Sequence, residues 1–289
     1  MVTTLVSTTL TANSEATIGP ALESVVGQVD ACIVIDTGVS DGTLEVAREV
    51  CGGKFRVRSL VWPISFADAR NFALLAAREY GADWAVTLDT DERLSFAPGF
   101  VLRDELASLP ETNVLYASAH DRSYMKERVV RLASAVRWYG FTHELTMPYQ
   151  EPGQAVHCAG LSFRELVKTP AQLRAKHERD VGLLSAMVMV DERSPRWICY
   201  LAGTLQNLER PAEAIPLFVV AAQLWNWEGE GATCAYRAAG CCWELGEWAR
   251  AVEILQQGLA AQPDSRELEF YLKIAKRKVQ VGLPGGLLQ

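Results

Sequence analysis

The chain has 289 residues, of which 49% are hydrophobic and 22% are charged. This composition supports one large domain or two modest ones, and it excludes a disordered chain or a disulfide-stapled miniprotein. The net charge of −7 argues against a general nucleic-acid or membrane-surface binder, because such proteins rely on clustered Lys and Arg.

The seven cysteines include no C-x-x-C pair, which favours reduced, mostly buried thiols in a cytosolic protein. The neighbours Cys241 and Cys242, on an expected helix, point about 100° apart and form a poor disulfide. The N-terminus lacks the basic region of a signal peptide. The longest weakly polar run, residues 181–190, is too short to cross a bilayer. We expect a soluble, cytoplasmic protein without a membrane span.

Strands and helices alternate over the first 120 residues. The pattern predicts strands at 2–8, 31–36, 55–61 and 83–88, and helices at 15–28, 43–51 and 66–80. Asn13 or Ser14 and Thr43 are the expected helix caps, and Gly81 is a stop signal. This order predicts a mostly parallel, doubly wound sheet, in which ligands bind beyond the carboxyl ends of the strands. Two further strands are expected at 113–119 and 129–133.

From about residue 170 the pattern is helical, with a repeat at an offset of 37 residues. Gly203 matches Gly240, Leu208 matches Leu245, and Ala214 matches Ala251. The spacing is similar to the tetratricopeptide (TPR) helix hairpin, whose period is nearer 34, so extra residues are expected around 225–229. A last helix is predicted at 265–280.

The strongest chemical signal is Asp89-Thr90-Asp91, which directly follows an apolar strand. In an extended chain, side chains two positions apart point to the same side, so the two carboxylates would converge. A divalent cation, manganese or magnesium, would remove their repulsion and could bridge to a diphosphate. The competing interpretation is a solvated acidic turn.

Three other segments carry candidate chemistry. Asp36 ends a strand before a Gly-rich turn and could accept hydrogen bonds from a base or ribose. Arg70, near a helix start, could bind a phosphate. His143 could be a metal ligand and Glu144 a general base. The competing structural roles are an ordinary strand–turn–helix connection, a helix-surface ion pair and a buried, hydrogen-bonded histidine. Neither G-x-G-x-x-G nor a P-loop is present.

These motifs together resemble the family-2 glycosyltransferases with a GT-A fold. The resemblance rests on NSE (13–15), VIDTGVSDGT (34–43), FADARN (66–71), TLDTDE (87–92) and RWYGFTHE (137–144). It is strongest to the bacterial subgroup that carries TPR repeats after the catalytic domain, and it covers roughly residues 2–260, including Val156-His157 and Arg179-Asp180. Ser14 and Val39 depart from the usual pattern, both around the pocket for the donor base.

The resemblance implies a GT-A-type, Rossmann-like and mostly parallel sheet flanked by helices, followed by an all-α TPR-like domain. The expected boundaries are 1–160 for the catalytic domain and 161–194 for a connecting helix. The TPR-like repeats would occupy 195–280 and a flexible tail 281–289.

The implied activity is metal-dependent, inverting transfer of one sugar from a nucleotide-sugar, most often UDP-linked, to a hydroxyl or thiol. Single-sugar addition is favoured because the Q-x-x-R-W motif of processive synthases is absent. Glu144 is the expected base, ahead of Glu92, although the roles of His143 and Glu144 could be exchanged. By family analogy, Asn13, Asp36, Arg70 and Asp89 would bind the donor, and Asp89, Asp91 and His143 would hold manganese or magnesium.

The acceptor stays open: a saccharide, a peptide, a small molecule or a hydroxylated base in DNA. The net charge of +3 over residues 120–180 marks this segment as the one to meet an anion and keeps the DNA alternative in view. A degenerate enzyme that binds proteins through its repeats is another alternative, and the repeats could also mediate a dimer. Nucleotidyl transfer is disfavoured, because residues 8–19 contain no Lys or Arg.

Overall fold

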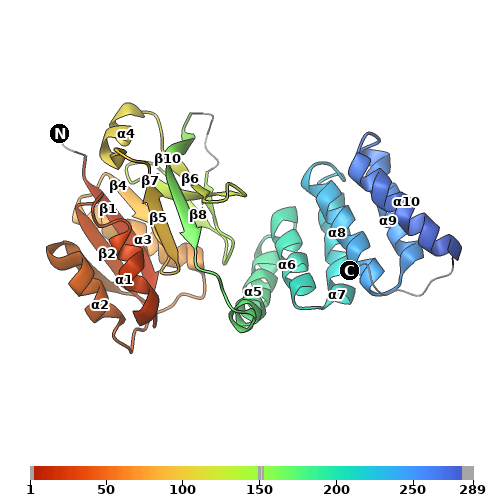
Figure 1. Cartoon of the computed structure of the whole chain (residues 1–289), viewed down its shortest axis with the longest axis horizontal. Coiled ribbons are helices and arrows are strands. Elements are labelled where there is room, and N and C mark those ends of the chain that lie inside the picture. The colour runs from red at the N-terminus through yellow and green to blue at the C-terminus, as the bar shows by residue number, and fades with distance from the viewer. Residues whose placement is uncertain (1–2, 149–150, 152, 282–289) are drawn as a thin grey trace. The chain divides into compact units, whose positions relative to one another are not determined.

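The computed structural model describes residues 3–148, 151 and 153–281. The chain divides into two compact units, Met1–Val167 and Lys168–Gln289, which are coloured red to green and green to blue in Figure 1. Of the expected tail 281–289, all but Val281 lies outside the described residues.

The first unit is built on an eight-stranded sheet in the order β3-β2-β1-β4-β7-β6-β10-β5. The first four strands of this order are all parallel. β7 then runs antiparallel to both β4 and β6, and β10 pairs in parallel with β6 and antiparallel with β5. The strands are β1 (Leu5–Thr11), β2 (Ala31–Asp36), β3 (Phe55–Ser59), β4 (Trp84–Thr87), β5 (Glu92–Phe96), β6 (Val114–Ala119), β7 (Met125–Arg131) and β10 (Ala155–Glu165).

Helices cover both faces of this sheet, which explains the unbroken apolar sequence of β2. Cys32 and Val34 pack on one face with α1 (Glu15–Glu23), α2 (Thr43–Cys51) and α4 (Leu102–Ser108). Ile33 and Ile35 pack on the other face with α3 (Phe66–Tyr80). A small separate hairpin, β8 (Arg137–Tyr139) with β9 (Leu145–Met147), contributes Trp138 to this second face.

The predicted GT-A-type sheet is confirmed, with local corrections. The bounds of β2, α2 and α3 agree with the prediction, and Gly81 ends α3 with a φ of 87°. The predicted cap Thr43 is wrong: Gly42 is the N-cap residue of α2, and Thr43 is its first residue. The helix expected over 15–28 ends at Glu23 and is followed by turns. β5, directly after the acidic motif, was not predicted.

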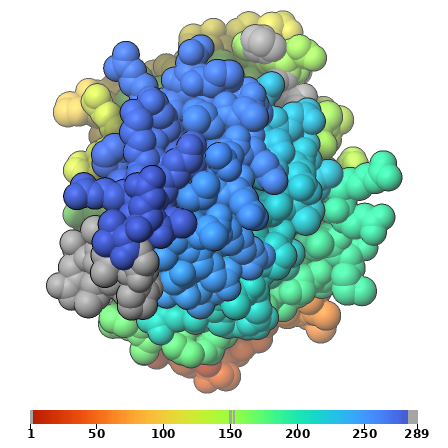
Figure 2. Space-filling model, turned by 90° about the vertical axis from the view of Figure 1, so that its right-hand side faces the viewer, coloured from red at the N-terminus to blue at the C-terminus, as the bar shows by residue number. Residues whose placement is uncertain are grey.

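The second unit is entirely helical, as predicted, and each helix packs against the next. α6 with α7 and α8 with α9 form the two hairpins of the repeat, and α9 and α10 (blue) fill much of the face seen in Figure 2. The helices are α5 (Pro170–Val190), α6 (Pro195–Asn207), α7 (Pro211–Leu224), α8 (Glu230–Glu244), α9 (Trp248–Ala261) and α10 (Arg266–Val281). No helix in the described part of the chain is long and apolar enough to span a bilayer.

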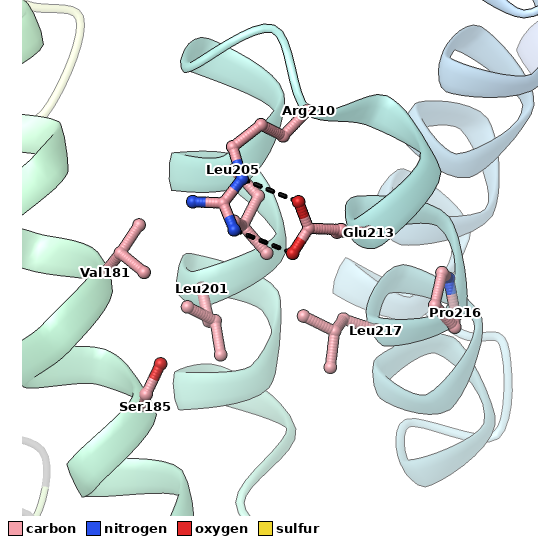
Figure 3. A pocket seen from close by; sticks show the side chains of 8 residues that line it. All are labelled: Val181, Ser185, Leu201, Leu205, Arg210, Glu213, Pro216 and Leu217. Atoms are coloured by element: carbon pink, nitrogen blue, oxygen red, sulfur yellow. Dashed lines mark hydrogen bonds and ion pairs between the residues drawn. The ribbon is translucent and has the colours of Figure 1, made fainter.

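A cavity of about 410 Å³ opens among α5, α6 and α7 (Figure 3). Its apolar lining includes Val181, Leu201 and Leu217. Arg210 and Glu213 form a two-pronged ion pair at its edge, with N–O distances of 2.6 and 2.7 Å. The helical unit therefore offers an apolar hollow with a neutralised charged rim.

Candidate active site

The carboxyl ends of β1, β2 and β4 meet at one edge of the sheet. Thr11 pairs with Asp36, and Thr8 with Thr87, in the parallel ladders. The ladders continue beyond the strand ends, because Leu88 donates its N–H to the Thr8 carbonyl at 3.0 Å. This edge carries the segments that the sequence singled out.

Asn13 and Asp36 both shape the loop after β2. Asn13 Oδ1 accepts the backbone N–H of Ser40 at 2.8 Å, and Asn13 Nδ2 donates to Ser40 Oγ at 2.9 Å. Asp36 Oδ1 accepts the N–H groups of Gly38 and Val39 at 2.9 and 2.8 Å. The two predicted donor-binding residues therefore both hold the same loop through hydrogen bonds.

The same loop is joined to the starts of α1 and α2. Asp41 Oδ1 accepts both the N–H and the hydroxyl of Thr43, at 3.1 and 2.5 Å. Hydrogen bonding to Thr43 holds the pKa of Asp41 below its usual value. Glu15 Oε2 in turn accepts the N–H of Gly42 at 3.1 Å. Asp41 therefore braces this turn through its hydrogen bonds to Thr43.

Arg70 lies at the centre of the candidate site, and its side chain is only 11% exposed. Its Nη2 donates to Asp89 Oδ1 at 2.9 Å, and its Nε donates to Glu144 Oε1 at 3.0 Å. Arg70 is therefore not part of a helix-surface ion pair. It brings together two carboxylates that the sequence assigned to separate roles.

Asn71, the next residue along α3, fixes the segment that carries His143 and Glu144. Its Nδ2 donates to the Trp138 carbonyl at 2.9 Å, and its Oδ1 accepts the Trp138 N–H at 2.8 Å. The Arg70 guanidinium lies 5.3 Å from the Trp138 ring. His143 and Glu144 follow in the connection from β8 to β9, where His143 has a φ of 52°.

Three charged residues behind this centre were not predicted as a group. Glu92 is 0% exposed and pairs with Lys126 Nζ at 2.8 Å and directly with Arg128. Arg128 also reaches Asp89 Oδ2 at 3.5 Å, and Lys126 pairs with Glu165. The only available signal was the excess of positive charge over 120–180. Lys126 and Arg128, two of the basic residues in that segment, bind carboxylates of the protein itself.

The charges of this cluster shift the pKa values of Asp89 and Arg70. Burial raises the pKa of Asp89, but Arg70, Arg128 and Lys126 outweigh it and hold that pKa well below its usual range. Burial lowers the pKa of Arg70, but Asp89 and Glu144 outweigh it and raise that pKa above its ordinary value. Both groups are thus charged at neutral pH.

Asp91 does not follow the geometry that the sequence suggested. β4 ends at Thr87, residues 90 and 91 form a turn, and the Glu92 N–H donates to the Asp89 carbonyl at 3.0 Å. The expectation of an extended segment is wrong here, so the alternation argument for convergent carboxylates does not apply. A turn places the two side chains independently.

The sequence matches the profile described as Glycosyl transferase family 2 over residues 9–167, more than half of the chain. The chain belongs to glycosyl transferase family 2. A TPR repeat-containing protein of Synechococcus elongatus is 39% identical over 102 residues, which is 35% of this chain. The chain covers 24% of that relative's length.

Two solved structures show weaker similarity to this chain. Glucosyl-3-phosphoglycerate synthase of M. tuberculosis is 20% identical, with a TM-score of 0.29 over 45% of this chain and 57% of that protein. The Sgt2 TPR domain of Aspergillus fumigatus is 14% identical, with a TM-score of 0.33 over 41% of this chain and 82% of that domain.

The described residues of this chain do not by themselves form a divalent-metal site. Within residues 3–148, 151 and 153–281, no three His, Cys, Asp or Glu side chains group as a metal site. Asp89 directs both carboxylate oxygens to arginines. Asp91 could offer a carboxylate oxygen and His143 an imidazole nitrogen, and manganese accepts both kinds of ligand. A diphosphate would have to supply further oxygen ligands.

Proposed function

We propose that this glycosyltransferase transfers one sugar, with inversion, from a UDP-sugar to a hydroxyl or thiol of an acceptor. The observation that carries the proposal is the bridge from Arg70 to Asp89 and Glu144 at the carboxyl edge of the sheet. The Arg70 guanidinium can bind a diphosphate through charge-assisted hydrogen bonds. The Glu144 carboxylate beside it can act as a proton acceptor. The loop held by Asn13 and Asp36 lies at the same edge and would bind the uracil and ribose.

Glu144 is the proposed base for a single displacement. Its side chain is 12% exposed, so it can meet an acceptor while its contact with Arg70 fixes its direction. As the acceptor oxygen or sulfur attacks the anomeric carbon, Glu144 takes the acceptor's proton and the nucleoside diphosphate leaves from the opposite face. Inversion follows because one bond forms on the face opposite the bond that breaks.

Asp91 and His143 are the proposed metal-binding residues, together with oxygens of the donor diphosphate. A bound manganese or magnesium ion would supply positive charge to the leaving diphosphate. Asp89 has a different role in this proposal: it orients Arg70 and Arg128. This assignment makes Asp91, rather than Asp89, the carboxylate whose loss removes metal dependence.

A thermal-shift comparison of UDP, GDP, CDP and dTDP, each with manganese or with EDTA, tests the donor site. A ligand at 100 times its Kd stabilises by about 2.7 kcal/mol, which raises the Tm by a few degrees. We expect UDP with manganese to raise the Tm and UDP with EDTA to have little effect. Asp91→Asn should lose the manganese-dependent part, and Asp104→Asn, on an exposed position of α4, should retain it.

The outcomes separate the alternatives. A larger response to GDP would contradict the uridine assignment, and an equal response in EDTA would contradict the metal. No response to any nucleotide would favour a degenerate protein that binds partners through its repeats. The DNA alternative is weakened by Arg131, whose Nη2 donates to the Leu109 carbonyl at 3.0 Å. A partner or dimer contact through the repeats stays a prediction.

A further inference from the structure

Two pairs of cysteines meet inside the molecule. Cys199 on α6 and Cys234 on α8 have their Sγ atoms 3.2 Å apart. Cys32 on β2 and Cys51 on α2 share a hydrogen bond. All four are free thiols. The pairs differ in access: Cys32 and Cys51 are 0% and 4% exposed, whereas Cys199 is partly exposed beside a fully buried Cys234. The helical pair is therefore the more accessible of the two pairs.

The surroundings of Cys199 favour its thiolate. The hydrogen bond from Cys234 lowers the pKa of Cys199; burial opposes this, and the positive charges of Arg237 and Arg196 add to it, against Glu230. The Arg237 guanidinium is fixed in place, since it donates to Gln206 Oε1 at 3.1 and 2.9 Å. A partly exposed thiolate near fixed positive charge is the reactive form of cysteine.

We propose that Cys199 and Cys234 form a disulfide between α6 and α8 when the protein meets hydrogen peroxide. The Cys199 thiolate attacks a peroxide oxygen, so that an S–O bond forms, the O–O bond breaks and hydroxide leaves. The Cys234 thiol then attacks the sulfenic sulfur, its proton passes to the departing oxygen, and that oxygen leaves as water. The hydroxide of the first step takes up the proton that the Cys199 thiol had released. Two thiols are oxidised by two electrons, and one peroxide becomes two waters. The sulfur atoms must approach by about 1.2 Å.

The bond joins the first helices of two successive hairpins and closes a segment with a sequence separation of 35 residues. Such a link constrains the unfolded helical unit and raises its Tm, on the order of 10 °C. α6 also contributes Leu201 and Leu205 to the cavity of the helical unit. Oxidation therefore fixes one wall of that cavity relative to α8.

Peptide mapping of the full chain tests the proposal. The protein is treated with hydrogen peroxide, its remaining thiols are alkylated under denaturing conditions, and the digest is analysed by mass spectrometry. We expect one linked pair of peptides that contains Cys199 and Cys234. Its mass should be two hydrogen masses below the sum of the two reduced peptides, and dithiothreitol should split it into those peptides. The buried pair Cys32 and Cys51 is the internal control and should be recovered alkylated. The Tm should rise on oxidation and return on reduction.

Variants locate the reaction. Cys199→Ser should abolish the linked pair and the Tm response, and Cys241→Ser, at a fully buried thiol in α8, should leave both unchanged. Cys234→Ser should leave a sulfenic acid on Cys199 that dimedone traps. Recovery of Cys199 and Cys234 as alkylated thiols after peroxide treatment would overturn the proposal, and so would a disulfide between two copies of the chain. Mapping of the unaltered protein decides the matter even if a variant fails to fold.

Discussion

Individual charged side chains across the candidate site form one alternating series. Each member is held by opposite charges on both sides, except at the two ends. Residues distant in sequence meet in it: Arg70 and Glu144 are 74 positions apart. Removing one partner of such a buried pair leaves an uncompensated charge, which costs about 3–5 kcal/mol. In order, the series is Glu165, Lys126, Glu92, Arg128, Asp89, Arg70 and Glu144.

Glu144→Gln tests the role of the proposed base. The amide keeps the size of the side chain and an oxygen for Arg70 but cannot accept a proton at neutral pH. We expect kcat to fall by about 10²–10⁴-fold, while the Kd for the nucleotide changes only a few-fold. Glu111→Gln, at an exposed position, is the control and should retain kcat. An equal loss of kcat and nucleotide affinity would show that Glu144 serves in donor binding instead.

Asp89→Asn tests the charge network through pH. Because folding lowers the pKa of Asp89, its charge stabilises the folded state above the unfolded pKa of about 4. That contribution is lost as pH falls from there toward the lower, folded pKa. Urea unfolding should therefore show the original protein more stable than Asp89→Asn at pH 7. The difference should shrink progressively below pH 4 (about the unfolded pKa of Asp), and a constant difference would contradict the ion-pair explanation.

At the scale of elements, the sequence predicted correctly those helices and strands whose bounds depend on neighbouring residues alone. The bounds of β2, α2 and α3 follow from apolar runs, helical spacing and a Gly stop. β5 was missed because ERLSF carries two charged residues among five and is a strand only through its pairing with β10, some seventy residues later. The prediction that the acidic motif is extended was wrong for the same reason. β4 ends before the motif, and a turn leads from it into β5. Motifs named candidate residues, but they did not predict the contacts that Arg128 and Lys126 make with Asp89 and Glu92.

The equivalent glycines of the two hairpins provide a matched pair of substitutions. A Cβ at Gly240 meets nothing within 4 Å, whereas one at Gly203 would lie 2.8 Å from Arg237 Nη2. Alanine gains about 1 kcal/mol over glycine inside a helix. Gly240→Ala should therefore raise the free energy of unfolding by about 0.5–1 kcal/mol. Gly203→Ala should lose that gain, because Arg237 must leave Gln206.

Urea denaturation of both variants, alone and combined with Arg237→Ala, measures the difference. With the guanidinium removed, Gly203→Ala should become as favourable as Gly240→Ala. If Gly203→Ala stabilises the protein equally in both backgrounds, the close approach of Arg237 does not restrain this position.

At the scale of the whole chain, the uneven charge along the sequence has a structural explanation. Residues 1–119 carry a net charge of −8, and residues 120–180 carry +3. β7 lies beside β4 in the sheet and brings Lys126 and Arg128 to the acidic segment that follows β4. At Lys126 and Arg128, opposite charges of the two sequence segments are thus paired within the first unit. The positive charge of a sequence segment does not by itself show whether that segment binds an anionic partner or pairs with acidic residues of the same chain.

The division of the chain can be tested by where it tolerates a cut. The two compact units meet at Val167 and Lys168, and α5 packs against α6 with Leu184 and Met187 buried. A fragment of residues 1–167 ends at the boundary, whereas a fragment of 1–194 retains α5 but removes α6. We expect 1–194 to expose apolar surface, bind more of a hydrophobic dye and aggregate on size-exclusion chromatography, and 1–167 to elute as a compact species.

The fragments also report on what the repeats contribute. Fragment 168–289 should be helical by circular dichroism and unfold cooperatively by itself, because its helices pack in series with one another. If 1–167 retains full transferase activity, the repeats are an independent module. If 1–167 aggregates while 1–194 stays monodisperse, α5 belongs with the catalytic unit, as a connecting helix over 161–194 would require, and the boundary at Val167 is contradicted.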